Sequence, residues 1–557
     1  MIAGVRVSGW EHNSAVLIAV AAGEQGSGTL QRLHADGTPA GRPETVGDLA
    51  AAVAARERAD GSRWIWSSTP ALYPPLLRRG VRVARCHDLQ LTEALLLGYH
   101  GRWGEPRALA AIHARRHGLP VPADPAPADP VPPGSGPIQA ALFDDLAEPP
   151  EEIAVVVEAY ADQLARIADV AEAGRFRLLV ALESAGALAA AEMGHHGLPW
   201  DAAAHDAVLR ELLGEPTPGG GPPRRLVELR ERITEAFGGA RLNPESPADV
   251  LRAFSRAGIV LPSTRAHVLR GVDHPAAPLI VEYKELYRLW TSHGWSWRAQ
   301  WVRDGRFRPE YVAGGVVSGR WATRGGGALQ IPKAVRRAVV ADPGWTLVVA
   351  DAGQLEPRVL AAVAGDGRLA AAAATGDLYA ALATDAFGGD RAAAKVAMLG
   401  AMYGQTGGDA VPALAALQAK YPVAWEYVQA AARTGEGGGL VRSWLGRTCP
   451  PAGGGPTSGA QARARGRFTR NFVIQATAAE WALALLAGVR TRLAATSAQL
   501  VFFQHDEVVV HAPADEADEV AEAVRAAGEQ AGRLLFGDTQ VRFPLDVSVV
   551  RCYADAK

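Results

Sequence analysis

The amino-acid sequence predicts a mixed α/β protein that is divided into several domains. Its 557 residues are more than one hydrophobic core usually supports. Apolar residues make up 48% of the chain and charged residues 21%, which is ordinary usage for globular proteins rather than for disordered or fibrous ones. Amphipathic stretches with helical periodicity occur together with short β-branched runs, so both helices and sheets are expected.

Two acidic residues fall at the ends of predicted strands. Amphipathic helices are predicted for Ala154–Ala171, Pro223–Phe237 and Asp515–Phe536. Buried strands are predicted for Thr346–Ala350, Leu500–Phe503 and Val508–His511, the last two joined by a tight polar turn. Asp351 follows the first strand and Asp506 lies in the turn. A rigid sheet can hold carboxylates at such positions close together.

Three stretches rich in proline or glycine divide the chain. Leu119–Pro137 cannot form a helix or a central strand, so it separates an N-terminal region or forms a long insertion within it. Gly214–Arg224 falls between helical stretches, as the tip of a helical hairpin would. Gly435–Gly439 and Pro450–Gly459 interrupt the C-terminal half. The sequence has no repeat of fixed period.

Charge and cysteine content exclude little. The formal net charge of −2 is weak evidence against nucleic-acid binding, because a local basic cleft is compatible with it. Cys86, Cys449 and Cys552 have neither metal-ligand nor redox spacing, which fits a reducing cytosol. No apolar run looks long enough to span a bilayer. We therefore expect a soluble cytoplasmic protein with no membrane partner.

The first motif that suggests chemistry begins at Asp351. A carboxylate that closes an apolar strand is often only a helix cap or a turn residue. The residues that follow resemble the first polymerase motif of family A DNA polymerases, for which Asp-Tyr-Ser-Gln-Ile-Glu-Leu-Arg is typical. The matching residues are Asp351, Gln354, Glu356 and Arg358, and the departures are Ala352, Gly353 and Pro357.

The second motif consists of residues spaced four apart along one face of a predicted helix, at Arg391, Lys395, Leu399 and Tyr403. Taken alone, it could be the solvated basic end of a helix that faces the core. It resembles the fingers helix of family A, which implies that Arg391 and Lys395 hold the nucleotide triphosphate and that Lys395 acts in catalysis. A cationic pair one turn apart neutralises charge that develops on the departing pyrophosphate. The resemblance implies that Tyr403 lies beside the templating pair.

The third motif is Gln504-His505-Asp506-Glu507, which resembles the family's His-Asp-Glu turn. The tripeptide alone is common, but here it lies between two strands and follows the other motifs in order. The resemblance implies that Asp351 and Asp506 hold two Mg²⁺ ions, for which Mn²⁺ can substitute, and that Ala352 adds a backbone carbonyl. Two metal ions suit in-line phosphoryl transfer, and Mg²⁺ prefers hard oxygen ligands. Glu507 would be a supporting acid.

Further segments resemble parts of the family that contact DNA. Ser318-Gly319-Arg320 resembles the Thr-Gly-Arg-Leu segment, and Leu329–Pro332 resembles Leu-Gln-Asn-Ile-Pro without the Asn. The DNA-contacting residues implied are Arg320, Gln330, Arg467, Asn471, Gln475 and His505. Those on the Arg467–Gln475 segment would line the minor groove, whose nearly degenerate acceptors report pairing geometry rather than sequence.

Four residues are expected to affect nucleotide selection. Leu399 replaces the family's Phe or Tyr and loses ring stacking, so altered sugar discrimination is expected. Tyr379 stands where a phosphate-contacting His is usual, and a phenol donates one hydrogen bond without a positive charge. The resemblance implies that Glu356 rejects ribonucleotides and accepts a bond from Tyr403, and that Gln354 also belongs to the nucleotide site.

The resemblance implies an α/β (α+β) right-hand polymerase with palm, fingers and thumb, preceded by a degenerate ribonuclease H-like 3′–5′ exonuclease domain. Bacterial polymerase I proteins often carry a flap nuclease ahead of the exonuclease domain. Because the polymerase resemblance begins by about residue 183, we expect too few preceding residues for both domains. The exonuclease-like domain is expected at 1–180, with a linker or insertion at 119–137, and the polymerase domain at 181–557. Within the polymerase domain, the thumb is expected at about 190–300, the fingers at about 355–475, and the palm at about 301–354 and 476–557.

The N-terminal region lacks most of a proofreading site. Asp88, followed by a predicted helix, resembles one exonuclease carboxylate. The required Asp-x-Glu pair is missing, because residues 1–22 offer only Glu11, and Tyr160-Ala-Asp162 has the wrong spacing for Tyr-x-x-x-Asp. A site stripped of most carboxylates cannot hold its ions against their hydration. We expect this region to be inactive.

These motifs together predict a DNA-directed DNA polymerase, which is a nucleotidyltransferase of DNA replication or repair. Its expected substrates are primer–template DNA and deoxynucleoside triphosphates. We expect a monomer that is associated with the nucleoid. One alternative is a non-catalytic relative kept for binding primer–template DNA, which Leu399 and Tyr379 favour. Retention of Asp351, Asp506 and the basic helix argues against it, because a scaffold needs no metal ligands. An RNA-making enzyme is disfavoured by Glu356.

Overall fold

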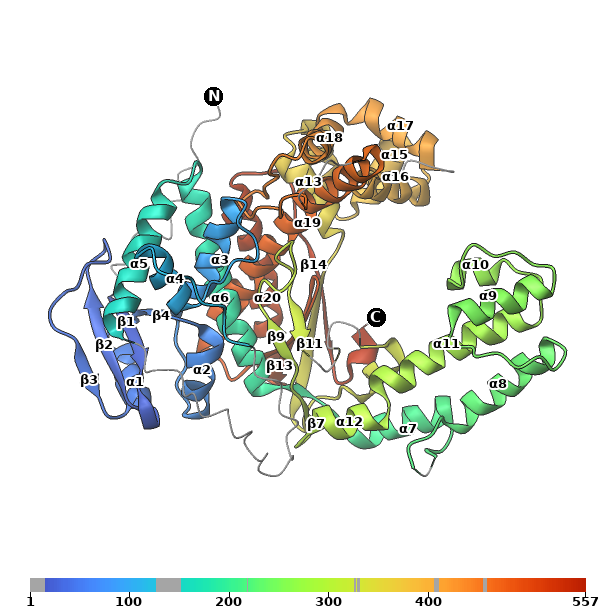
Figure 1. Cartoon of the computed structure of the whole chain (residues 1–557), viewed down its shortest axis with the longest axis horizontal. Helices are drawn as coiled ribbons and strands as arrows, with labels where there is room; N and C mark the ends of the chain where they lie inside the picture. The colour runs from blue at the N-terminus through green and yellow to red at the C-terminus, as the bar shows by residue number, and fades with distance from the viewer. Residues whose placement is uncertain are drawn as a thin grey trace.

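The computed structural model describes residues 16–126, 152–217, 219–324, 327, 331–404, 410–453 and 458–556. It has an N-terminal sheet at one end, a second sheet at the centre, and two helical lobes that extend from the central sheet (Figure 1). The prediction of mixed helices and sheets is confirmed.

The N-terminal part contains a five-stranded mixed sheet in the order β3-β2-β1-β4-β5. Its first three strands are antiparallel, and β4 and β5 run parallel to β1. The strands are β1 (Leu17–Ala22), β2 (Gly28–Leu33), β3 (Glu44–Val46), β4 (Arg63–Trp66) and β5 (Arg85–Asp88). The helices are α1 (Leu49–Asp60), α2 (Thr69–Arg78), α3 (Leu89–Tyr99), α4 (Leu109–Arg116) and α5 (Ile153–Ala168), with the 3₁₀ turn η1 (Glu24–Gly26).

Alternate residues of β1 belong to two different cores. Ile18 and Val20 pack with α1 and α2 on one face, whereas Ala19 and Ala21 pack with α4 and α5 on the other. Strand β1 is therefore a central strand of a sheet that helices cover on both faces.

The central sheet is four-stranded and antiparallel, in the order β12-β13-β11-β14. Its strands are β11 (Trp345–Ala352), β12 (Gln499–Gln504), β13 (Glu507–Pro513) and β14 (Leu545–Val550). One face is covered by α6 (Ala173–His196), α19 (Gly459–Arg492) and α20 (Ala517–Phe536), and the other by α7 (Ala202–Leu213), α12 (Trp295–Trp301), η3 (Lys333–Ala338) and η5 (Tyr553–Ala556). The predicted strands and the tight turn between the last two are confirmed.

The two lobes are helical. The upper one in Figure 1 contains α13 (Leu355–Val363), α14 (Gly367–Ala373), α15 (Leu378–Ala386), α16 (Arg391–Tyr403), α17 (Ala410–Lys420) and α18 (Pro422–Glu436). The right-hand one contains α8 (Arg224–Ala236), α9 (Pro247–Arg256), α10 (Ala266–Arg270) and α11 (Ala276–His293). Small sheets at their bases comprise β6 (Leu198–Pro199), β7 (Val302–Arg303), β8 (Arg306–Phe307), β9 (Glu310–Val312) and β10 (Ala322–Arg324).

Helix α19 is the longest hydrophobic element and begins with a capping box, in which Ser458 and Gln461 bond each other's backbone. With its following turn, α19 is long and apolar enough to cross a membrane, but 89% of its apolar window is buried inside the protein. It therefore packs as a core helix. The boundaries expected at 180/181 and 475/476 fall inside α6 and α19, so one helix continues across each of them.

A buried ionic cluster joins the N-terminal part to α19. Arg490 on α19 donates to both carboxylate oxygens of Glu192 on α6, at 2.7 and 3.0 Å, and to the Ala84 carbonyl at 2.7 Å. Tyr73 and Arg82 also donate to Glu192. Arg490 and Glu192 are both 5% exposed. Removal of Glu192 would leave Arg490 as a buried unpaired charge, and removal of Arg490 would leave Glu192 with only the partly exposed Arg82 as its counter-charge.

We expect Arg490→Ala to lower the free energy of unfolding by about 3–5 kcal/mol, because Glu192 would remain buried without its main partner. Denaturant unfolding followed by circular dichroism measures this. The matched control is Arg525→Ala, which removes an exposed pair with Glu522 and should cost less than about 1 kcal/mol. Equal losses in the two variants would contradict the expectation.

Candidate active site

The candidate site begins with a row of acids across the central sheet. Asp351 on β11 pairs with Glu507 on β13 and with Asp546 on β14. Directly opposed residues of antiparallel strands lie on the same face, so three carboxylates share this row. Asp506 is adjacent, and its carbonyl accepts a 3.1 Å hydrogen bond from the Ala352 N–H. The structure therefore brings the chain around Asp351 and Asp506 together; Asp546 was missed because β14 carries no motif.

A two-residue turn sets the position of Asp506. Gln504 pairs with Glu507, which leaves only His505 and Asp506 to reverse the chain. His505 has φ +58°, the left-handed conformation that such turns need. Glu507 is buried and accepts a hydrogen bond from the Tyr553 hydroxyl, so it is anchored in the protein.

The donor set of this site suits a hard divalent cation. Asp351 and Asp506 offer carboxylate oxygens and Ala352 a backbone carbonyl, which are ligand types that Mg²⁺ prefers. Neighbouring carboxylates repel each other, and a divalent cation between them would offset that repulsion. The residues present therefore fit such an ion.

Glu356 connects three of the predicted motifs. One carboxylate oxygen accepts from Arg320 at 2.5 Å and the other from the Tyr403 hydroxyl at 2.5 Å. Burial raises the pKa of Tyr403, and the bond to Glu356 raises it further, so the phenol stays a donor. The expected bond between Tyr403 and Glu356 is present, and both oxygens of Glu356 are held in place.

Helix α16 presents its polar residues on one face. Arg391, Lys395 and Tyr403 are exposed and Leu399 is half-buried. The opposite face is buried and consists of Ala394, Ala397, Met398, Gly400, Ala401 and Met402. Asp390 caps the first turn by accepting from two backbone N–H groups, and Gly404 ends the helix with φ +68°. The two cationic side chains are thus one turn apart on an exposed surface.

Asp377 is a partner of Arg391 that the sequence motifs did not reveal. Its carboxylate accepts from Arg391 at 2.8 Å and from the Gln354 amide at 2.8 Å. Burial alone would raise the pKa of Asp377, but these bonds outweigh it and lower the pKa to about 2. Gln354 also accepts from the Leu378 N–H, so its amide is engaged with the start of α15. The position of Asp377 before a helix is a cap signal that could have marked it.

The Tyr379 ring lies beside the guanidinium of Arg391. The Arg391 guanidinium is 5.7 Å from the centre of its ring, within cation–π range. The side chain is 6% exposed, and burial raises its pKa to about 12. Tyr379 therefore remains a neutral phenol at neutral pH.

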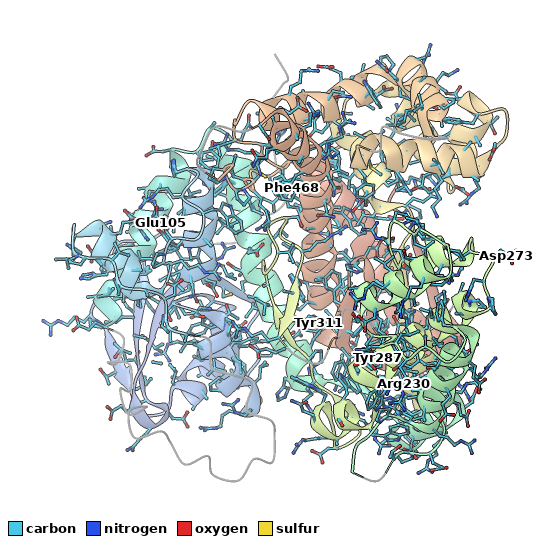
Figure 2. The ribbon with its side chains drawn as sticks, turned by 45° about the vertical axis from the view of Figure 1, so that its right-hand side comes forward. Glu105, Arg230, Asp273, Tyr287, Tyr311 and Phe468 are labelled. Carbon is cyan, nitrogen blue, oxygen red and sulfur yellow. The ribbon has the colours of Figure 1, made fainter. Side chains whose placement is uncertain are left out.

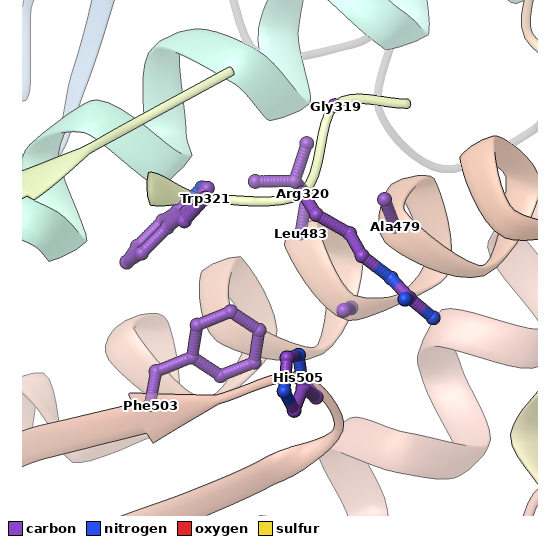
Figure 3. A pocket seen from close by; sticks show the side chains of 8 residues that line it. Gly319, Arg320, Trp321, Ala479, Leu483, Phe503 and His505 are labelled. Carbon is purple, nitrogen blue, oxygen red and sulfur yellow. The ribbon is translucent and has the colours of Figure 1, made fainter. Parts of the chain in front are cut away.

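The predicted DNA-contacting residues occupy two neighbouring regions. Figure 3 shows Arg320 and Trp321 on one side of a small pocket and Phe503 and His505 on the other, with α19 behind. Burial lowers the pKa of His505, and the nearby Arg320 lowers it further. Gly319 has φ +81°, and a Cβ there would overlap the Arg447 guanidinium, so a side chain would be strained and crowded.

The other predicted contacts lie along α19. Arg467 is exposed, while Asn471 and Gln475 are half-buried one and two turns later. The Arg467 side chain passes so close to Gly404 that a Cβ there would be 2.9 Å from its Cγ, which joins this face to the end of α16. Gln330 lies outside the described residues.

Comparisons with known proteins agree with this arrangement. A sequence model described as DNA polymerase family A matches residues 223–554, which is more than half of the chain. The chain belongs to DNA polymerase family A. The match includes the acids, α16 and α19, and the order of the predicted motifs is that of the family.

Relatives and a solved structure extend this family assignment. DNA polymerase I of Deinococcus radiodurans is 25% identical over 58% of this chain and 37% of its own length. DNA polymerase I of Chloroflexus aurantiacus is 29% identical over 54% and 36%. The chain thus aligns with little more than a third of these relatives. The POL domain of Pol1 from M. smegmatis, in complex with DNA primer-template and dNTP, shares the fold, with a TM-score of 0.71 at 20% identity over 98% of this chain and 96% of that one.

Asp88 has a structural role in this family A protein. It is fully buried at the end of β5, and its carboxylate accepts from the N–H groups of Leu91 and Thr69. Burial raises its pKa. The helix expected after it is α3, which Asp88 caps. Glu11 lies outside the described residues, and Asp162 pairs with Arg116 and Arg166.

Tyr311 supports the edge strand that leads to Asp506, and no sequence motif marked this residue. It is 7% exposed on β9, and its hydroxyl donates to the Phe503 carbonyl at 3.1 Å and accepts from the Phe503 N–H at 3.2 Å. Figure 2 shows Tyr311 near the centre of the molecule. Because β12 has a neighbouring strand on one side only, this phenol satisfies backbone groups that would otherwise be unpaired.

We expect Tyr311→Phe to destabilise the protein by about 1–3 kcal/mol, because two buried backbone groups of Phe503 would lose their partner. Denaturant unfolding measures the loss, and faster hydrogen exchange at the Phe503 amide localises it. Tyr287→Phe, which removes a phenolic hydroxyl from α11 (Figure 2), should leave the exchange rate of the Phe503 amide unchanged. Unchanged exchange in Tyr311→Phe would refute the role of the hydroxyl.

Proposed function

We propose that this chain is a DNA-directed DNA polymerase that adds deoxynucleotides to a primer 3′-hydroxyl, in DNA replication or repair. The observation that carries the proposal is the convergence of Asp351 and Asp506 at adjoining strand ends, connected through Glu356 to the exposed cationic face of α16. The same acids without the cations would bind metal but would not attract a triphosphate.

The acidic residues would hold the metal ions of the reaction. Asp351, Asp506 and the Ala352 carbonyl are the ligands we assign, with Glu507 anchored behind them by Tyr553. When bound, two Mg²⁺ or Mn²⁺ ions supply an activated primer hydroxyl and neutralise charge on the phosphates.

The basic residues of α16 would bind the triphosphate. Lys395 is exposed and keeps its point charge available for the phosphate oxygens. Arg391 is half-exposed, so a triphosphate can share or replace its bond to Asp377 at small cost. Tyr379 would lend a neutral hydrogen bond where the family usually has a His.

Glu356 and the minor-groove residues would select the nucleotide. Both oxygens of Glu356 are fixed by Arg320 and Tyr403, so its bulk stays where a ribose 2′-hydroxyl would collide with it. Arg467, Asn471 and Gln475 would check pairing geometry in the minor groove, and Arg320, His505 and Gln330 would also contact the DNA. Leu399 would stack less well on the incoming nucleotide than an aromatic ring.

The names of the relatives and of the solved complex support DNA and deoxynucleotides as substrates. We further propose that the α8–α11 lobe is the thumb, the α13–α18 lobe the fingers and the central sheet the palm. A monomer in the cytoplasm, associated with the nucleoid, is the simplest setting for these activities.

Primer extension by the purified chain with four deoxynucleotides and Mg²⁺ tests the proposal. We expect Asp351→Ala and Asp506→Ala each to reduce extension by at least about 100-fold, because a metal ion contributes several kcal/mol to transition-state stabilisation. Asp538→Ala, a charge loss in the turn after α20, is the matched control and should not change the rate.

Two outcomes would contradict this expectation. If the wild-type chain binds primer–template DNA but extends no primer, the non-catalytic alternative is correct. If extension in both aspartate variants stays within about tenfold of wild type, these acids are not the metal ligands.

We also propose that the N-terminal part is an exonuclease-like domain without proofreading activity. The assignment rests on its mixed sheet and on Asp88, whose oxygens are engaged in capping α3. The Asp88 side chain is 0% exposed, so a hydrated ion could reach it only if the surrounding structure opened.

On a mismatched primer with Mg²⁺ and no nucleotide, we expect no loss of 3′ nucleotides, because the domain lacks a carboxylate set that can hold two ions. Gel electrophoresis of the labelled primer measures this. Degradation that persists in Asp351→Ala but disappears in Asp88→Asn would refute the proposal; Asn keeps a helix cap, so that variant should fold.

A further inference from the structure

Three side chains with metal-binding atoms converge in the N-terminal part, far along the chain from Asp351. His113 lies on α4, His117 ends that helix, and Glu158 lies on α5. One ligand atom from each lies within 4.8 Å of the others. Residues four apart on a helix share a face, so both imidazoles are directed to the same side.

The distances leave room for an ion between these groups. The His117 Nε2 is 2.8 Å and the His113 Nδ1 3.6 Å from the two oxygens of Glu158. The ring centres of the two histidines are 4.4 Å apart. The Nδ1 atom of His113 is buried and, among the described residues, has no hydrogen-bond partner. A buried ring nitrogen without a hydrogen-bond partner is rare in proteins, and a metal ion bound there would satisfy it.

We propose that His113, His117 and Glu158 form a transition-metal site that takes Zn²⁺. Two imidazole nitrogens and one carboxylate are a usual zinc ligand set, with water in the fourth position. Mg²⁺ and Ca²⁺ prefer oxygen ligands throughout, so imidazoles disfavour them. The site is separate from the acids of the central sheet and does not depend on the proposed polymerase activity.

Arg116 is the competing cation, and the structure provides it with another partner. It donates to Glu158 at 2.7 Å and to Asp162 at 3.1 Å. When Glu158 turns to the metal, Arg116 keeps Asp162, so no charge is left unpaired. Asp162 is also bonded to Arg166, which holds it in place on α5.

The position of the site gives the metal a structural role. Between His117 and Glu158 the chain includes the whole proline-rich stretch, so the ion would close this long connection at its two ends. Cross-links that close long loops remove the most entropy from the unfolded chain. Metal binding to such a site adds to folding stability, because the ligands are not assembled in the unfolded state.

The test uses the full-length chain carrying Asp351→Ala and Asp506→Ala, so that the central acids contribute no metal binding. Zn²⁺ is titrated in competition with a chromophoric chelator. We expect one equivalent of Zn²⁺ to bind. His113→Ala or His117→Ala should weaken binding by at least about tenfold, because loss of a group that only supports a metal ligand already weakens binding by that much. His195→Ala, at the end of α6, is the matched control and should bind Zn²⁺ like the parent.

A second measurement separates binding from misfolding. Thermal unfolding in chelator should be the same for the parent and the histidine variants, whereas Zn²⁺ should raise Tm in the parent alone. Co²⁺ in place of Zn²⁺ should give visible absorption that Glu158→Gln alters. Absence of stoichiometric Zn²⁺ binding, or binding that survives both histidine substitutions, would overturn the proposal.

Discussion

The register between β11 and β13 is the constraint on which the rest of the site depends. Seven consecutive residue pairs, from Trp345 opposite Pro513 to Asp351 opposite Glu507, fix how far each strand reaches. A slip of one residue would turn Asp351 to the opposite face. The register cannot slip without exposing apolar residues on both sides, because alternate residues of β11 are buried in two separate cores. Hydrophobic packing thus determines where the carboxylates lie.

Electrostatic pairing then connects this row to the helical lobe. Glu356 follows the acidic strand by only a few residues, yet it binds Arg320 from one segment and Tyr403 from α16. The Asp377 carboxylate likewise accepts hydrogen bonds from two segments, through Arg391 and Gln354. Glu356 and Asp377 are therefore each held by donors from two other segments. The row of acids on the sheet suits cations because its carboxylates are hard oxygen ligands.

Two long helices continue across the positions at which the sequence suggested domain boundaries. Helix α6 packs on the N-terminal sheet and on the central sheet, and α19 extends from the upper lobe to the Arg490 cluster. Such helices bury surface on several sides, as the buried residues of α6 and of the second half of α19 do. Composition marks flexible connections, but it does not mark a rigid helix that two units share.

The sequence by itself determined the acids, the basic helix and their order, because each depends on local spacing that strand and helix geometry convert directly into position. It also indicated a tight polar turn at Asp506, and the strand register then showed that the turn has two residues. Tertiary structure alone decided the partners: Asp377 with Arg391, Tyr311 with Phe503, and His113 with Glu158. The physical reason is that these pairs join segments with no periodic relation, so the packing of whole elements decides which side chains meet.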